Sequence, residues 1–235
     1  QILIGCGAFI ELAVIAAAQR GIAVKVELFP SGSPSEQDLP KGSRVATLIL
    51  GGAGSASTDP LFAQIVRRHT RKTAYESGRP LPATLVRSWE ETAIRFGLRG
   101  GVVAGLEGMD SIRRITREAY EIESTTPRTW LESARLLRIG PSAIATNPDG
   151  ISLNSPMLRA LHTLGLFDPM EVPARGSKAL ERVMERWVPF ETASGFLWLA
   201  SADNTRAAQL AAGRAYVRAH LLATAAGVDM HPLSQ

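Results

Sequence analysis

The sequence predicts an α+β fold, in which helices and strands alternate along the chain. Three observations predict it. Apolar residues recur at helical spacing in several stretches, other stretches alternate at the period of a strand, and one helix-glycine-strand pattern occurs near both ends. The 235 residues, of which 45% are hydrophobic and 20% charged, suffice for one large domain or two small ones with an ample core.

Local signals predict the elements of the first part of the chain. A mostly apolar helix is expected from Gly7 to Arg20, ended by Gly21 in a left-handed conformation. Residues 22–29 alternate as a strand does, residues 30–43 have the composition of a loop, and 45–50 resemble a buried strand. The glycine-rich residues 51–57 lack the Gly-Lys-Ser/Thr ending of a phosphate-binding loop, so we interpret them as a flexible connection.

The same signals predict the remaining elements. A turn is expected at Asn147–Gly150. The last helix should be capped by Asp203 or Asn204 and run to Gly227. The other predicted helices cover 85–96, 109–122, 128–137, 156–164 and 178–187, and the predicted strands cover 101–105 and 195–200 and begin again at 228.

The repeated pattern is the most informative feature. Residues 7–21 can be laid over residues 213–227 without a gap. The pairs of small residues that then coincide are Gly7 and Gly213, Ala13 and Ala219, Ala17 and Ala223, and Gly21 and Gly227. Small residues at this spacing suit a helix that packs closely in the middle of an assembly, where backbones must approach. Chance likeness between alanine-rich helices is the alternative; a true duplication predicts two related halves.

A basic stretch, residues 67–72, is a candidate anion site. It follows a short helix that we expect to be capped by Asp59, with Leu61, Phe62, Ile65 and Val66 as its buried face. If the chain then extends, Arg68, Thr70 and Lys72 point the same way. Two cations with a hydroxyl between them suit a terminal phosphate. The alternative is a solvated basic turn.

Composition argues against several classes of partner and site. The net charge of +4 is spread among acids, so we expect no nucleic-acid partner. Cys6 is the only cysteine and is expected to be a small buried residue. No apolar run reaches membrane-spanning length, so we expect no membrane association. The absence of a signal peptide favours the cytoplasm, and periplasmic export stays open if a signal precedes Gln1.

Other polar and aromatic residues are expected to have structural roles. The four histidines have no metal-ligand spacing, and His220 is predicted to be packed within the last helix. Trp130, Trp187 and Trp198 are predicted to lie in the core, and Glu132 and Arg138 to form a helix ion pair or face an interface. Apolar residues directly after Gln1 and a strand-like turn just before Gln235 predict a portion of a longer protein.

An ordered series of short motifs resembles the nitroreductase-like flavoproteins. It comprises Ile4–Ala8, Arg68–Thr70, Trp130–Ser133 with Leu137–Gly140, Asp149–Leu153 and His231–Gln235. The closer likeness is to the twin, Acg-like branch, in which two nitroreductase halves are fused into a pseudo-dimer. This resemblance implies a mixed, mainly antiparallel sheet flanked by helices, with residues 1–57 as the remnant of a largely missing first half and residues 58–235 as the second half. The fused pair would need no second subunit, although a homodimer is compatible with it.

The resemblance also implies a cofactor and its site. Nitroreductases bind the phosphate of FMN through an Arg-x-Ser/Thr-x-Lys/Arg segment, which corresponds to Arg68, Thr70 and Lys72. Their last segment lies against the flavin ring, which corresponds to Pro232, Ser234 and Gln235. Single-domain members usually have Pro-x-Glu-Gly there, so the last two residues depart from the pattern.

The resemblance implies a reaction in which no catalytic side chain is required. Two electrons would pass from NAD(P)H through FMN to a nitro compound, a quinone or a similar acceptor, with the flavin carrying the electrons. The alternative is a non-catalytic protein that stores or sequesters FMN. A basic binding module without a cofactor is a third hypothesis.

Overall fold

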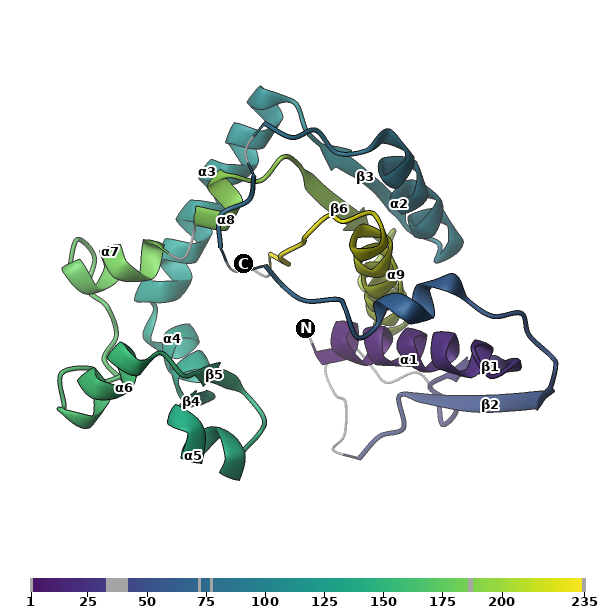
Figure 1. Cartoon of the computed structure of the whole chain (residues 1–235), viewed down its shortest axis with the longest axis horizontal. Helices are drawn as coiled ribbons and strands as arrows, with labels where there is room; N and C mark the ends of the chain where they lie inside the picture. Colours follow the sequence, from purple (N-terminus) through teal and green to yellow (C-terminus); the bar gives the residue numbers. More distant parts are fainter. Residues whose placement is uncertain (1, 33–41, 72, 77, 186–187, 234–235) are drawn as a thin grey trace. The chain divides into compact units, whose positions relative to one another are not determined.

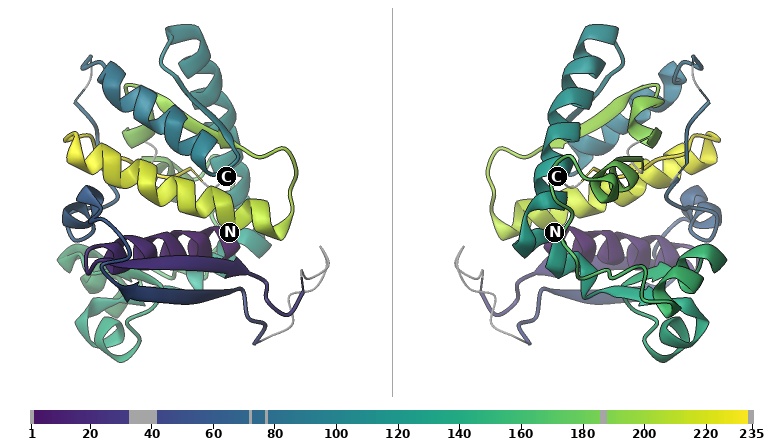
Figure 2. Two further views of the ribbon diagram at one scale, coloured as in Figure 1. Left: turned by 90° about the vertical axis from the view of Figure 1, so that its right-hand side faces the viewer. Right: turned by 90° about the vertical axis from the view of Figure 1, so that its left-hand side faces the viewer.

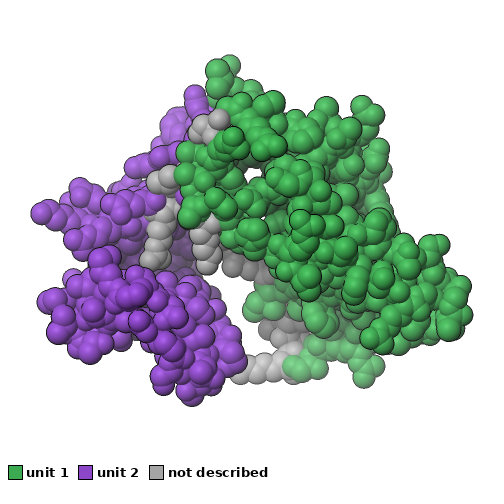
Figure 3. All heavy atoms as spheres, in the orientation of Figure 1, with its two compact units in different colours: residues 1–109, 192–234 green, residues 110–191, 235 purple. Residues whose placement is uncertain are grey.

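The computed structural model describes residues 2–32, 42–71, 73–76, 78–185 and 188–233. The chain forms two compact units (Figure 3): unit 1 contains Gln1–Met109 and Thr192–Ser234, and unit 2 contains Asp110–Glu191 and Gln235. The chain contains both helices and short strands, and most of its strands pair in small antiparallel sheets, which confirms the predicted α+β class. The described strands form three two-stranded sheets, two antiparallel and one parallel. A nitroreductase-like sheet shared by two halves stays a prediction.

Unit 1 is built on two helices that lie side by side, α1 (Ile2–Ala18) and α9 (Arg206–Ala225) (Figure 1). Figure 2 shows the layers around them: α2 (Ala83–Arg95) packs on α9, and the hairpin of β1 (Ile22–Leu28) and β2 (Ala46–Ala53) packs on α1. Apolar residues of both helices face these layers, because α1 is apolar on nearly all sides and α9 is buried along most of its length.

Two glycines allow α1 and α9 to approach closely. A Cβ atom on Gly7 would overlap the backbone oxygen of Leu210, and one on Gly213 would overlap the backbone oxygen of Ile4. The repeat places Ile4 over Leu210, so the two contacts are equivalent and reciprocal, as across a two-fold axis. The close backbone approach predicted from the small residues is therefore confirmed.

The two helices also end alike. Gly21 and Gly227 adopt φ values of 70° and 68°, the left-handed conformation in which a Cβ is unfavourable. The Gly21 N–H donates to the Ala18 carbonyl at 2.9 Å, and the Gly227 N–H donates to the equivalent Thr224 carbonyl at 3.2 Å. The predicted left-handed cap at Gly21 is confirmed, and Gly227 adopts the same conformation.

Two apolar clusters hold the layers of unit 1 together. Leu3, Ile10, Phe29 and Leu210 are buried between α1 and the hairpin, with Cys6 half-buried beside them. Between α2 and α9 the cluster contains Leu85, Trp89, Ala219 and Ala223. The Trp89 indole N–H donates to the Ala219 carbonyl at 2.8 Å, so the one polar atom of this side chain is satisfied.

An antiparallel pair completes the sheets of unit 1. β3 (Arg99–Val103) pairs with β6 (Phe196–Ala200), with Gly101 opposite Trp198. Trp198 is 43% exposed, so its predicted place in the core is wrong. Its ring covers the bare backbone of Gly101 instead, because glycine leaves room there for an aromatic side chain.

The short helix before the basic stretch is a 3₁₀ helix, η1 (Pro60–Gln64). Asp59 caps it as predicted, since its carboxylate accepts a hydrogen bond from the Leu61 N–H at 3.0 Å. Leu61 is buried, but Phe62 is 39% and Val66 is 92% exposed. Ile65 packs against the same apolar cluster as Leu61, so the predicted buried face is wrong only for Phe62 and Val66. A 3₁₀ helix has three residues per turn, and this one ends before Val66.

Two further local predictions are corrected. Residues 51–53 belong to β2 and are not a flexible connection, because they continue the pairing with β1. The cap of α9 is Thr205, whose hydroxyl accepts from the Ala208 N–H at 3.2 Å. Asp203 does not cap the helix, because its carboxylate accepts hydrogen bonds from Thr205 itself.

Unit 2 consists of short elements that follow the long α3 (Leu106–Thr125), whose first residues belong to unit 1. β4 and β5 pair in parallel. The remaining elements are α4 (Pro127–Ala134), β4 (Leu137–Ile139), α5 (Gly140–Thr146), β5 (Ile151–Leu153), α6 (Pro156–Thr163), α7 (Lys178–Met184) and α8 (Val188–Glu191). The predicted helix 128–137 is too long, because its last residue already pairs with β5.

Side chains of unit 2 depart in part from the predicted roles. Arg138 pairs with Asp149 at 3.2 Å and not with Glu132, which is exposed. Trp130 is half-buried, and its indole N–H donates to the Pro169 carbonyl at 2.9 Å. Trp187 lies outside the described residues. None of the described helices is both long and apolar enough to cross a membrane.

Candidate anion-binding site

The basic stretch and the last segment of the chain lie side by side in unit 1. Thr70 forms a parallel bridge with Met230, and the Arg71 N–H donates to the Met230 carbonyl at 3.0 Å. This pairing brings Arg68 and Thr70 to the segment that contains the exposed Pro232. Three other predicted site residues, Lys72, Ser234 and Gln235, lie outside the described residues.

The side chain of His220, on α9, contacts the beginning of this stretch. Its Nε2 atom lies 3.1 Å from the His69 carbonyl oxygen. A carbonyl only accepts hydrogen bonds, so Nε2 carries the proton and Nδ1 is an acceptor. Nδ1 lies 3.5 Å from Nη1 of Arg68 and 3.3 Å from the Tyr216 hydroxyl, which both can donate to it.

His220 is neutral at pH 7. The side chain is buried, as predicted, and burial together with the Arg68 charge lowers its pKa from 6.5 to about 4. A neutral acceptor next to a guanidinium leaves the charge of Arg68 uncompensated. Among the described residues, no carboxylate lies within ion-pair distance of Arg68.

One edge of the Arg68 guanidinium lacks a hydrogen-bond acceptor among the described residues. Nε is buried, and neither it nor Nη2 donates to an acceptor in the described part of the chain. Nε and Nη2 form the edge on which two N–H bonds run parallel, the geometry that binds a carboxylate or phosphate with two hydrogen bonds. A buried donor without an acceptor costs about 1–3 kcal/mol, so an oxyanion at this edge would remove a penalty as well as gain a charge contact.

Other polar groups lie around the basic stretch. Asp229 lies 3.5 Å from both His69 and Arg71, so the charge of Arg71 is partly compensated. Burial and the nearby Asp229 carboxylate raise the pKa of Tyr75 to about 12, and burial raises the pKa of Tyr216. Both phenols are therefore protonated at pH 7 and can donate hydrogen bonds.

The charge and the hydrogen-bond donors of this cluster suit an anion. Its neutral imidazole and protonated phenols do not exchange protons near pH 7, while Arg68 keeps an available charge. On unit 2, a surface depression of about 510 Å³ offers the opposite environment, because Glu121, Glu181, Glu185 and Glu191 line it against Arg117. A phosphate would be repelled there. In the described part of the chain, no three His, Cys, Asp or Glu side chains group to hold a metal ion.

The repeat in the sequence, and not a short motif, distinguishes His220 and Tyr216 from the rest of α9. The repeat places His220 over Val14 and Tyr216 over Ile10. Polar residues thus replace apolar ones on the face of α9 that contacts the basic stretch. Asp229 and Tyr75 had no such signal.

Comparison with known proteins gives no match: no protein-family model matches this chain, and no curated protein is significantly similar to it.

The lowered pKa of His220 predicts a pH dependence of stability. An unfolded histidine binds a proton below about pH 6.5, whereas folded His220 does so only near pH 4. The unfolded state therefore binds more protons in this window, and the free energy of unfolding falls as the pH drops through it. The loss should approach about 3 kcal/mol at pH 4.

Urea denaturation at pH 7.5 and at pH 4.5 measures this effect, with His220→Gln as the reference variant, because carboxylates also titrate in this range. Wild type should lose more stability than the variant. An equal loss in both proteins would show that folding does not shift the titration of His220.

Proposed function

We propose that this chain contributes the phosphate-binding wall of a nitroreductase-like, FMN-dependent oxidoreductase. The observation that carries the proposal is the Nε and Nη2 edge of Arg68, which has no acceptor among the described residues and lies next to the bridge between Thr70 and Met230. The residues fit the group. Arg68 offers both a positive charge and a buried N–H without an acceptor, and Thr70 offers a hydroxyl. Such donors suit a phosphate monoester.

The pairing of the two segments supports the assignment to FMN. The resemblance assigned the phosphate to Arg68 and Thr70 and the flavin ring to the segment of Pro232, from separate parts of the sequence. Their adjacency allows one molecule to span both. The reciprocal contacts of Gly7 and Gly213 support a pseudo-dimer of two related halves.

The roles of the residues follow from their chemistry. Bound FMN would supply two-electron transfer between NAD(P)H and a nitro compound, a quinone or a similar acceptor. Arg68 would bind two phosphate oxygens, and the Thr70 hydroxyl would donate to a third. The backbone at Pro232 would face the ring, where proline offers an apolar surface and no N–H.

Replacement of Arg68 tests the phosphate assignment. Arg68→Ala should weaken FMN binding at least about tenfold, because a charge-assisted, two-bond contact is lost. Arg67→Ala is the matched control: Arg67 is the exposed neighbour, 3.3 Å from Gln64, and its replacement should leave affinity unchanged. Quenching of flavin fluorescence measures the affinity.

The two functions within the proposal are separated by turnover. Steady-state oxidation of NADPH or NADH with a nitroaromatic acceptor would support the oxidoreductase, whereas bound flavin that stays oxidised in excess nicotinamide would support storage of FMN. Wild type that does not bind FMN, or Arg68→Ala that binds it normally, would contradict the phosphate site.

A further inference from the structure

We infer that His220 is the positioning residue that aims Arg68 at the phosphate and makes the site selective for phosphorylated flavins. The inference rests on the proposed function and goes beyond it, because His220 has no counterpart in the motifs that indicated FMN. His220 is 1% exposed, and the described contacts of its ring reach the basic stretch and Tyr216.

The tautomer of His220 determines which part of Arg68 is left for a ligand. The His69 carbonyl holds the proton on Nε2, so a lone pair of Nδ1 points toward Nη1 of Arg68. Because the guanidinium is planar and rigid, a contact at Nη1 orients the whole group. The edge of Nε and Nη2 is then left without an acceptor, and its two N–H bonds suit two oxygens of one phosphate.

The absence of charge on His220 matters as much as its geometry. A carboxylate at this position would neutralise Arg68, and a cation would repel it. The neutral imidazole orients the guanidinium and leaves its charge for the ligand. Tyr216, Arg68 and His69 face the ring, and of these Tyr216 contributes a protonated hydroxyl to the same Nδ1 atom.

The asymmetry of the repeat supports a specific role. Val14 occupies the position equivalent to His220 on α1, so an apolar side chain is compatible with this place on a closely packed helix. A buried imidazole costs desolvation that a valine would not. The cost is offset by the contacts to residues 68 and 69, which are the contacts that the site needs.

A comparison of two flavins tests the inference, because riboflavin lacks the phosphate of FMN. His220→Leu should weaken FMN binding about tenfold and leave riboflavin affinity unchanged within about twofold. His220→Gln should restore most of the FMN affinity, because its amide can donate to the His69 carbonyl and accept from Arg68. His162→Leu, which removes a histidine that contacts Phe167 in unit 2, is the matched control and should bind FMN normally.

Each outcome decides a different point. Equal weakening of both flavins by His220→Leu would indicate a merely structural role and overturn the inference. Unchanged FMN affinity in that variant would overturn it as well and leave the proposed function standing. Wild type that binds neither flavin would contradict the proposed function itself.

A measurement on the wild-type chain does not depend on the folding of any variant. Long-range ¹H–¹⁵N NMR spectra of the histidine rings distinguish the two neutral tautomers. The expected state of His220 at pH 7 is the neutral ring with its proton on Nε2. A proton on Nδ1 would leave no acceptor for Arg68 and would overturn the inference.

Discussion

Gly213→Ala should destabilise the chain by about 3 kcal/mol, although alanine is the better helix former. The added methyl group would overlap the backbone oxygen of Ile4, and a backbone atom cannot turn aside as a side chain can. The two helices would have to separate along their whole contact. Gly7→Ala should have a similar effect for the equivalent reason, since its methyl group would meet the Leu210 oxygen.

Gly5→Ala is the matched control, because Gly5 lies on the same helix and a Cβ there would meet nothing within 4 Å. This variant should be more stable than wild type by about 0.5–1 kcal/mol. Urea denaturation followed by circular dichroism measures all three. The double variant at Gly7 and Gly213 should cost less than the sum of the single ones, since one separation accommodates both methyl groups. Equal stability of Gly213→Ala and Gly5→Ala would refute the close approach.

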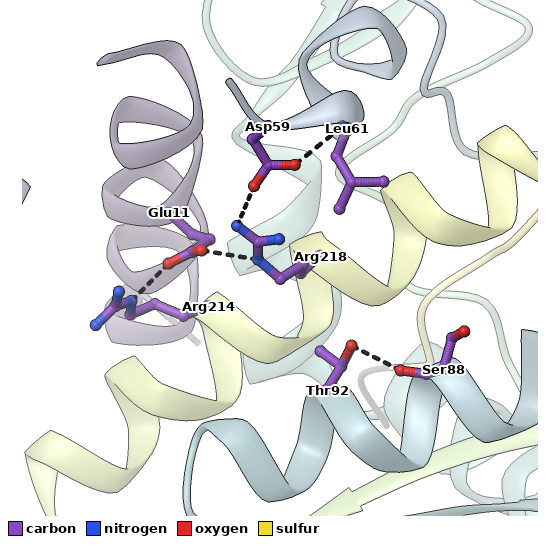
Figure 4. A network of polar contacts seen from close by, with 7 residues as sticks. All are labelled: Glu11, Asp59, Leu61, Ser88, Thr92, Arg214 and Arg218. Carbon is purple, nitrogen blue, oxygen red and sulfur yellow. Dashed lines mark hydrogen bonds and ion pairs between the residues drawn. The ribbon is translucent and has the colours of Figure 1, made fainter. Parts of the chain in front are cut away.

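Glu11→Ala should have the second large effect, a loss of about 3–5 kcal/mol. Glu11 is fully buried and lies between two arginines of α9 (Figure 4): its carboxylate oxygens are 2.8 Å from Nε of Arg214 and 2.9 Å from Nε of Arg218. Arg218 in turn contacts Asp59 at 2.6 Å. Removal of Glu11 would leave Arg214 without its carboxylate partner and the buried Arg218 with Asp59 alone, and that penalty exceeds the value of an ordinary ion pair.

An exposed ion pair provides the comparison. Glu27 lies 2.7 Å from Lys25 on β1. The free energy of unfolding of Glu27→Ala should equal that of wild type within experimental error, because water already screens this exposed pair. A double-mutant cycle between Glu11→Ala and Arg218→Ala should give a coupling energy of more than about 1 kcal/mol. Additive effects of the two variants would mean that the network is not formed.

The sequence was a good guide to the long helices and a poor one to contacts between distant residues. The pattern of small residues predicted the approach of α1 to α9, because helix periodicity and residue size are local properties. The strands β4 and β5 were missed because each has three residues and is stabilised by a partner that no local pattern reveals. Glu11 had no assigned role, since its arginine partners are 203 and 207 residues away.

The candidate site shows the same division. The spacing of Arg68 and Thr70 predicted a phosphate site, because a phosphate suits these residue types. What the structure adds is the adjacency of Thr70 to Met230 and the contact of Arg68 with His220, which depend on how α9 meets the chain after η1. The residue type alone predicted that Trp198 lies in the core, but its ring lies over Gly101 on the opposite strand and is exposed. The sequence around Trp198 does not reveal this partner.

The contact between α1 and α9 joins residues from opposite ends of the described chain, and this has a consequence for biosynthesis. α1 is translated before α9, so the face around Gly7 meets its partner only after α9 has been translated. Until then an almost wholly apolar helix is exposed, which favours aggregation or binding by chaperones. Closing so long a loop also slows folding. Unit 1 therefore completes its core only after α9 has been translated, and the basic stretch can pair with the segment around Met230 only after that.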